Sequence, residues 1–282
     1  MIQRTIKAAA EIFIGVATII LTITVIRFAA LPIISDSFGW SDTTTSTVRR
    51  LLIILAVALI YWSFIRWNKA RRATEMAFTI VPIALSGLAG MAIIGFPILY
   101  LFMDGSYTLQ SVQFHPAIFN LALFIFSAAF LEEVLFRGIL FSSLEWHFGI
   151  KTALIVPSIA FSALHFFNAE WGGTLSFVSG ILLGLFWALN FAWTRNIWAV
   201  AVNHALWNFT IVLAGLPLTG QNDWLDISPL KSSVSGADWW SGGAAGPENT
   251  ILTVVILSIV VAAMLWRQFR IDPRLTVEIA QT

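Results

Sequence analysis

Long apolar segments run through the whole chain and leave few ways for it to fold. With 58% hydrophobic and 11% charged residues and a mean hydropathy of +0.84, the 282-residue chain cannot bury its apolar surface in a water-soluble core. A membrane-spanning helix needs roughly 20 apolar residues. We therefore predict an all-α, polytopic membrane protein with about eight transmembrane helices, at residues 8–34, 51–67, 76–103, 116–148, 151–168, 173–194, 197–217 and 249–266.

The basic residues between these segments indicate the orientation, because lysine and arginine concentrate on the cytoplasmic side of a membrane protein. With the N-terminus inside, only Arg49, Arg50 and Lys231 fall outside. The cytoplasmic side then holds Arg4, Lys7, Arg66, Lys69, Arg71, Arg72, Lys151, Arg195, Arg267, Arg270 and Arg274. We predict a single transmembrane domain over residues 1–282 with both termini cytoplasmic. The absence of organellar signals points to a prokaryotic plasma membrane.

Two stretches receive structural interpretations. Residues 219–248 form the one substantial polar stretch, rich in Gly, Ser, Asp and Trp, and on this orientation they face away from the cytoplasm. We interpret them as a tethered loop, with a cover over a cavity as the alternative. In the sixth segment, Gly180 and Gly184 have the spacing that lets two membrane helices pack closely.

The run Glu132-Glu133-Val134-Leu135-Phe136-Arg137 lies inside the fourth apolar segment. Ionisable groups at membrane depth are costly, and most are retained for function. Glu133 and Arg137 are four residues apart, so they share one helical face and can neutralise each other. Glu132 lies about 100° around the helix and has no basic partner in the segment, so burial would disfavour its charged form. These properties make Glu132 the candidate general base.

Two later segments contribute His165 and the pair His204 and Asn208. His204 and Asn208 share a helical face and can point into one polar cavity within the membrane, where they could donate hydrogen bonds to an oxyanion. His165 could hold a water molecule beside Glu132. If a zinc ion takes part, its ligands are His165, His204 and Glu132; the residues do not otherwise require a cofactor. Because the chain has no cysteine, thiolate ligands and cysteine nucleophiles are excluded.

Three motifs follow one another in separate segments: E-E-x-x-x-R at 132–137, F-x-x-x-H at 161–165 and H-x-x-x-N at 204–208. This ordered trio resembles the CAAX protease and bacteriocin-processing family of intramembrane endopeptidases, also called the Abi family. The family-like catalytic core lies within residues 116–217. The resemblance implies a helical membrane fold, peptide-bond hydrolysis with Glu132 as the water-activating base, and a site completed by Glu133, Arg137, His165, His204 and Asn208.

The resemblance also implies a membrane-associated substrate, such as a prenylated CAAX protein or a bacteriocin-like peptide. Nucleic acid is not expected as a partner, because no basic cluster is dense enough to bind it. Two other classes stay open. A secondary transporter also uses intramembrane acids, although it usually has broken helices and internal symmetry. A non-enzymatic immunity or scaffold protein is the third class, and ion-coupled uptake into vesicles would distinguish a transporter from a protease.

Overall fold

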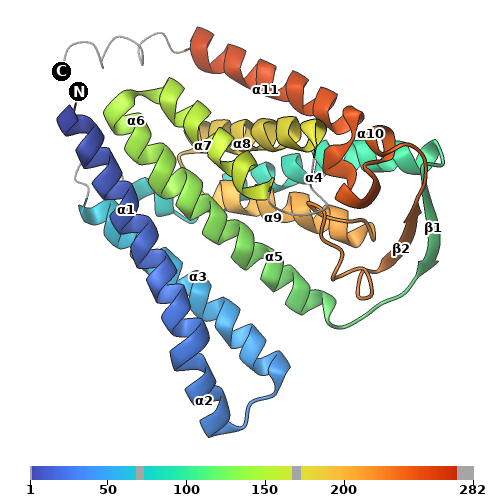
Figure 1. Cartoon of the computed structure of the whole chain (residues 1–282), viewed down its shortest axis with the longest axis horizontal. Helices are drawn as coiled ribbons and strands as arrows, with labels where there is room; N and C mark the ends of the chain where they lie inside the picture. Colours follow the sequence, from blue (N-terminus) through green and yellow to red (C-terminus); the bar gives the residue numbers. More distant parts are fainter. Residues whose placement is uncertain (1, 68–72, 167–172, 272–282) are drawn as a thin grey trace.

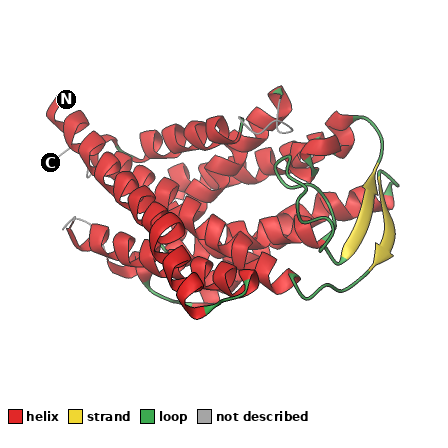
Figure 2. Cartoon of the chain, turned by 60° about the horizontal axis from the view of Figure 1, so that its bottom comes forward, coloured by secondary structure: helices red, strands yellow, loops and turns green. Residues whose placement is uncertain are grey.

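The computed structural model describes residues 2–67, 73–166 and 173–271, and these ranges are mostly helical (Figures 1 and 2). Within them, six helical stretches are long and apolar enough to cross a membrane, and two shorter apolar helices accompany them. The prediction of a polytopic, all-α membrane protein is confirmed. The predicted end of the fifth segment at residue 168 and the basic residues Lys69, Arg71, Arg72 and Arg274 lie outside the described residues.

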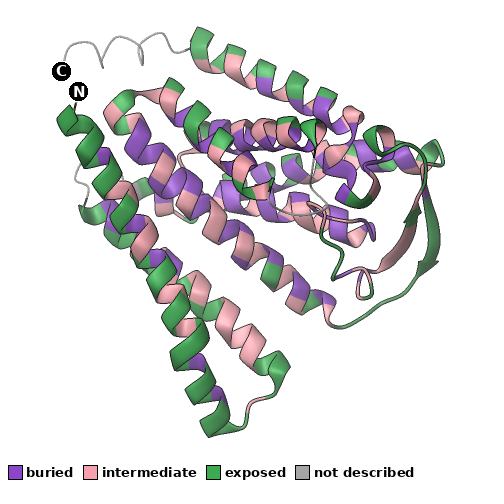
Figure 3. Ribbon diagram, in the orientation of Figure 1, coloured by how far each residue is buried: buried purple, intermediate pink, exposed green. Residues whose placement is uncertain are grey.

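The N-terminal helices form a long hairpin whose closed end, near residue 40, projects away from the rest of the bundle (Figure 1). Elsewhere the hairpin packs against the bundle, because a Cβ atom added to Gly15 would lie 2.9 Å from Ile139 Cδ1. Most of its surface is exposed in the isolated chain (Figure 3), which suits apolar helices that face lipid. Its elements are α1 (Ile2–Val25), the π-helical turn η1 (Ile26–Ala30), α2 (Leu31–Phe38) and α3 (Asp42–Trp67), followed by the 3₁₀ turn η2 (Ala73–Met76).

Both arms of this hairpin are longer than the predicted segments 8–34 and 51–67. The Ser41 hydroxyl accepts the backbone N–H of Thr44 at 3.2 Å, so α3 begins with a capped polar turn well before its apolar part. Hydropathy alone could not place that beginning, because a cap acts through one local hydrogen bond rather than through apolar residues.

The remaining helices form the main bundle, with α8 and α9 in its buried centre (Figure 3). The helices α7 and α9 have 16 and 17 residues, fewer than the roughly 20 of a full span. The bundle consists of α4 (Ile80–Met103), α5 (Ile118–Glu133), the π-helical η3 (Val134–Phe141), α6 (Ser142–Phe148), α7 (Ile150–His165), α8 (Thr174–Thr194), α9 (Ile197–Leu213) and α11 (Ile251–Ile271).

The helices α7 and α8 pack at very short range because small residues face each other. A Cβ atom added to Gly184 would lie 2.7 Å from the Cα of Ser158, and one added to Gly180 would lie 2.6 Å from the Oγ of Ser162. Only glycine allows this approach without a shift of the neighbouring helix. The packing role predicted for the two glycines is confirmed.

Residues 214–250 fold back onto the bundle, so the interpretation of 219–248 as a tethered loop is wrong. The strand β1 (Tyr107–Val112) pairs antiparallel with β2 (Leu230–Val234), and a bulge interrupts the register. The segment ends in three short turns before α11: α10 (Asp238–Ser241), η4 (Gly243–Ala245) and η5 (Pro247–Asn249).

Two contacts fix where this segment lies. Gly215 has a φ of +69°, and a Cβ atom there would lie 1.9 Å from the carbonyl oxygen of Leu230, so the chain turns sharply after α9. The Tyr107 hydroxyl donates a hydrogen bond to the Ser241 carbonyl at 2.7 Å. Both contacts hold the segment against the ends of α4 and α9.

Candidate active site

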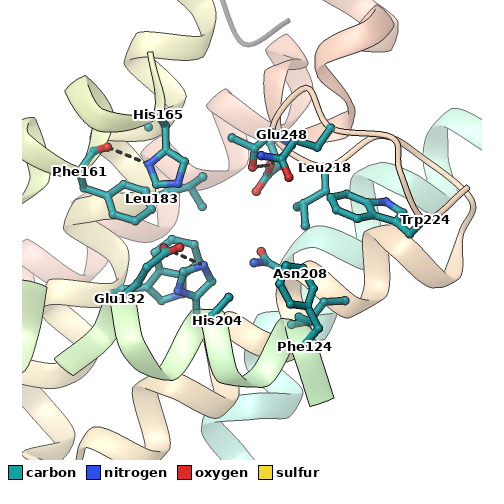
Figure 4. Close-up of a pocket in the computed structure, with 16 residues that line it drawn as sticks. Phe124, Glu132, Phe161, His165, Leu183, His204, Asn208, Leu218, Trp224 and Glu248 are labelled. Atoms are coloured by element: carbon teal, nitrogen blue, oxygen red, sulfur yellow. Dashed lines mark hydrogen bonds and ion pairs between the residues drawn. The ribbon is translucent and has the colours of Figure 1, made fainter. Parts of the chain in front are cut away.

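A cavity of about 220 Å³ lies between α5, α7, α8, α9 and residues from the 214–250 segment. Figure 4 shows its polar side chains pointing toward one another from these separate elements. The structure brings four of the predicted site residues to the cavity wall: Glu132, His165, His204 and Asn208. The other two, Glu133 and Arg137, are fully buried behind that wall.

The Glu133 carboxylate is the centre of the buried part of the site. Its Oε1 accepts hydrogen bonds from Arg137 Nη1 at 3.0 Å and from His204 Nδ1 at 2.8 Å. Arg137 Nη2 in turn donates to the carbonyl oxygen of Gly184 at 3.0 Å. The ion pair predicted from the four-residue spacing is therefore present, and it also ties α5 to α8 and α9.

Local structure explains why Arg137 can reach α8. The chain changes from α-helix to π-helix directly after Glu133, and the Ser142 hydroxyl donates to the Arg137 carbonyl at 3.0 Å. Segments of π-helix inside α-helices occur frequently at functional sites. The guanidinium carbon lies 5.3 Å from the ring centre of Phe161 and 5.7 Å from that of Trp187, so the cation is enclosed by aromatic faces.

Glu132 points into the cavity instead of into the packed core. Its side chain is 32% exposed, whereas that of Glu133 is 0% exposed. Glu132 is therefore only partly buried, less than the sequence led us to expect. Its Oε2 lies 4.0 Å from His204 Nε2 and has no hydrogen-bond partner among the described residues.

Hydrogen bonds fix which nitrogen of each histidine carries the proton. His204 Nδ1 faces the Glu133 carboxylate, and His165 Nδ1 faces the Phe161 carbonyl at 2.9 Å. Both partners are acceptors, so each Nδ1 must donate. In the neutral ring, Nε2 of each histidine is therefore left as an acceptor.

Stacking on aromatic rings holds the two imidazoles in place. His204 stacks on Trp187 with ring centres 3.7 Å apart, and His165 lies 4.2 Å from Phe161. Phe161, the first residue of the F-x-x-x-H motif, thus positions His165 both through its ring and through its carbonyl. Asn208 lines the same cavity, and its amide has no hydrogen bond to another described residue.

The residues proposed as zinc ligands do not converge as a metal site. A catalytic zinc usually takes three protein ligands. Among the described residues, no group of three or more His, Asp or Glu side chains lies close enough to hold a metal ion. His165, His204 and Glu132 share the cavity, but they do not meet at one point, and we derive no step through a metal.

We expect purified active protein to contain no stoichiometric zinc. Elemental analysis of the full chain, together with an assay after prolonged chelation, checks this expectation. One tightly bound zinc per active chain, lost together with activity in His165→Ala, would contradict it.

Sequence reasoning missed the contribution of the 214–250 segment to the cavity. Leu218, Thr219, Gln221, Trp224 and Glu248 all line it. The only signal in the sequence was the cluster of tryptophans in an otherwise polar stretch, which suggested a cover as the alternative interpretation. Nothing in the pattern distinguished Glu248 from an ordinary acid before an apolar helix.

Glu248 should also make stability depend on pH. Burial raises the pKa of its carboxyl above the ordinary value of 4.5, and hydrogen bonds from Trp207 and Thr219 together with the charge of His165 oppose this only partly. The neutral Glu248 side chain then contributes its full stabilisation of the folded protein below the pKa of the unfolded state. This stabilisation is lost as the pH rises through the pKa of the folded state. Relative to Glu248→Gln, the Tm of the wild type in detergent should fall from about pH 4.5 upward. A Tm difference that stays constant from about pH 4 to about pH 8 would contradict this assignment.

Comparison with known proteins bears on the same residues. Residues 114–210 match the family model described as type II CAAX prenyl endopeptidase Rce1-like, and this range contains all three motifs. No curated protein and no solved structure matched the chain. The family match supports a CAAX-type intramembrane protease in general and confirms the resemblance deduced from the motifs. Residues 114–210 of this chain are therefore similar to the type II CAAX prenyl endopeptidases of the Rce1-like family model.

Proposed function

We propose that the chain is an intramembrane endopeptidase that hydrolyses a peptide bond of a membrane-associated peptide or protein with water activated by Glu132. The observation that carries the proposal is the pair of acceptors at the cavity wall, Glu132 Oε2 and His204 Nε2, 4.0 Å apart. A water molecule between two acceptors can donate one hydrogen bond to each. Its oxygen lone pairs then face the cavity, where a substrate carbonyl would lie.

The buried residues support this role for His204. Arg137 neutralises Glu133, and Glu133 holds His204 Nδ1–H. This leaves Nε2 as an acceptor, so we assign His204 to the water and not to the oxyanion, which differs from the expectation from sequence. The amide of Asn208 keeps the role of oxyanion donor.

The reaction then follows from these assignments. Glu132 takes a proton from the water as the water oxygen bonds to the carbonyl carbon, and the carbonyl oxygen becomes an oxyanion that accepts from Asn208. When the C–N bond breaks, Glu132 returns the proton to the leaving amine. One water is consumed. Both of its protons are already donated, so the neutral His165, whose Nε2 is also an acceptor, is not a third partner of this water and keeps only its place on the cavity wall.

The position of the cavity supports a substrate that reaches it from the membrane. Its polar centre is surrounded by apolar side chains of the helices, so a prenylated CAAX-type protein or a bacteriocin-like peptide fits better than a free soluble protein. We also propose that both termini are cytoplasmic in a prokaryotic plasma membrane. The segment 214–250 then covers the cavity from the opposite side.

A direct test is to incubate the purified full chain with a peptide library and to map cleaved bonds by mass spectrometry. Cleavage by the wild type and none by Glu132→Gln is the expected result. Absence of cleavage, combined with proton- or ion-coupled uptake in vesicles, would replace the proposal with the transporter alternative.

A further inference from the structure

Glu248 brings a second cavity-facing carboxylate to the site, from outside the membrane-spanning helices. It lies in η5, is 2% exposed and lines the cavity together with Glu132 (Figure 4). No lysine or arginine is among the residues that line this cavity. Arg137, the cation behind the wall, already binds Glu133 and the Gly184 carbonyl. The described cavity wall therefore has two carboxylates and no lysine or arginine.

The hydrogen-bond donors that the described residues offer to the Glu248 carboxylate are all neutral. Its Oε1 accepts from Trp207 Nε1 at 2.9 Å, and its Oε2 accepts from the backbone N–H and the hydroxyl of Thr219 at 3.1 and 3.0 Å. A carboxylate offers about four acceptor sites, so these donors leave room for one more. A buried charge is normally paired. The described cavity wall offers Glu248 no lysine or arginine, and the one base whose charge acts on its carboxyl is His165.

An independent observation at Trp224 also points to a ligand. Trp224 is 5% exposed and lines the cavity, yet its indole N–H is buried with no hydrogen-bond partner among the described residues. Buried donors nearly always have a partner. The same segment therefore brings an unused donor and an acid without a lysine or arginine partner to the cavity wall.

The Glu248 carboxylate is held in a fixed position. Its own carbonyl accepts from the Ser179 hydroxyl on α8 at 2.6 Å, and a Cβ atom on Gly246 would lie 2.0 Å from the carbonyl oxygen of Pro217. These contacts leave the backbone on either side of Glu248 little freedom. A rigid, buried acid can select a ligand by charge, because it does not relax away from a wrong one.

We propose that Glu248 is a specificity-determining residue whose carboxylate binds a cationic group of the peptide close to the scissile bond. The inference rests on the proposed function and names its substrate class: peptides with a lysine or arginine side chain, or an N-terminal amine, beside the bond that is cut. The charge of this group would pair Glu248, while Trp224 Nε1 donates to a backbone carbonyl of the same peptide. Acidic groups at that position would be repelled.

The test uses internally quenched peptides based on a sequence that the wild type cleaves. Three versions carry lysine, norleucine or glutamate at each position flanking the scissile bond in turn, and N-acetylated copies distinguish a side chain from a terminal amine. We expect lysine to exceed norleucine in kcat/KM by about tenfold or more, as for a hydrogen bond to a charged group. Glu248→Gln should abolish this preference, Glu248→Asp should restore part of it, and Asp226→Asn, an exposed acid of the same segment, should retain it.

Two results would overturn the inference. One is a wild type that cleaves the three versions equally well at every position. The other is a Glu248→Gln variant that loses activity by the same factor on all of them, because a residue that only holds the segment in place affects every substrate alike.

A binding measurement separates this inference from the proposed function. Glu132→Gln is expected to bind lysine peptides of the library more tightly than norleucine peptides, and the double variant Glu132→Gln/Glu248→Gln is expected to bind both equally. If the wild type cleaves nothing, the proposed function fails, and this binding difference alone decides whether Glu248 selects cations.

Discussion

Replacing Glu132 by glutamine is expected to lower peptide hydrolysis by about 10² or more while the protein still folds. The amide keeps the shape of the side chain but cannot take a proton from water. Because Glu132 makes no hydrogen bond to another described residue and is 32% exposed to the cavity, little structure depends on its charge. The measurement is kcat/KM on a cleaved library peptide, with Tm in detergent as the test of folding.

A matched control is Glu11→Gln on α1, whose carboxylate lies 3.2 Å from His147 Nε2 and away from the cavity. It removes one partly buried acid of a helix outside the cavity and should leave turnover near that of the wild type. Near-normal turnover in Glu132→Gln itself would remove this residue from the mechanism.

Replacing Arg137 by alanine is expected to destabilise the protein by about 3–5 kcal/mol, because removing one partner of a buried ion pair leaves an uncompensated charge. Glu133 and Arg137 are both 0% exposed, and the Gly184 carbonyl loses its donor as well. Loss of expression or a lower Tm should accompany loss of activity. The measurement is thermal unfolding in detergent together with hydrolysis.

A double variant tests whether the unpaired charge of Glu133 causes this loss of stability. Glu133→Gln combined with Arg137→Ala leaves no unpaired charge, so it should recover part of the stability lost in Arg137→Ala alone. Unchanged stability of Arg137→Ala with activity abolished would instead assign Arg137 to direct contact with the substrate.

The parts of the site that could be predicted from sequence are those set by the spacing of residues on a single helix. The Glu133–Arg137 pair follows from a four-residue spacing on one helix, and the shared cavity of His204 and Asn208 follows from the same spacing. The hydrogen bond between His204 and Glu133 joins residues 71 positions apart, so periodicity could not reveal it. That bond decides the tautomer of His204 and hence its role.

In the fold, too, features set by nearby residues could be predicted, whereas those set by distant residues could not. Hydropathy located the helices of the bundle because lipid demands apolar length. The 214–250 segment escaped prediction because its pairing with β1 is non-local and its strand, Leu230–Val234, is short and mostly polar. With that pairing missing, Glu248 and Trp224 could not be placed near the cavity.

The π-helical stretch Val134–Phe141 divides one long helix into two halves, and it rotates the side chains of the second half about the helix axis relative to those of the first. The first half aims Glu132 at the cavity, and the second aims Glu145 at Arg195 and His147 at Glu11. Deleting one residue from an α-helix rotates everything beyond it by about 100°. Reverting this stretch to α-helix would therefore keep Glu132 aimed at the cavity while turning the second half away from both of these contacts. Arg137 lies within the stretch and would lose its reach to Gly184 as well, so the same π-helical turn sets both how the helix docks and how the buried ion pair is placed.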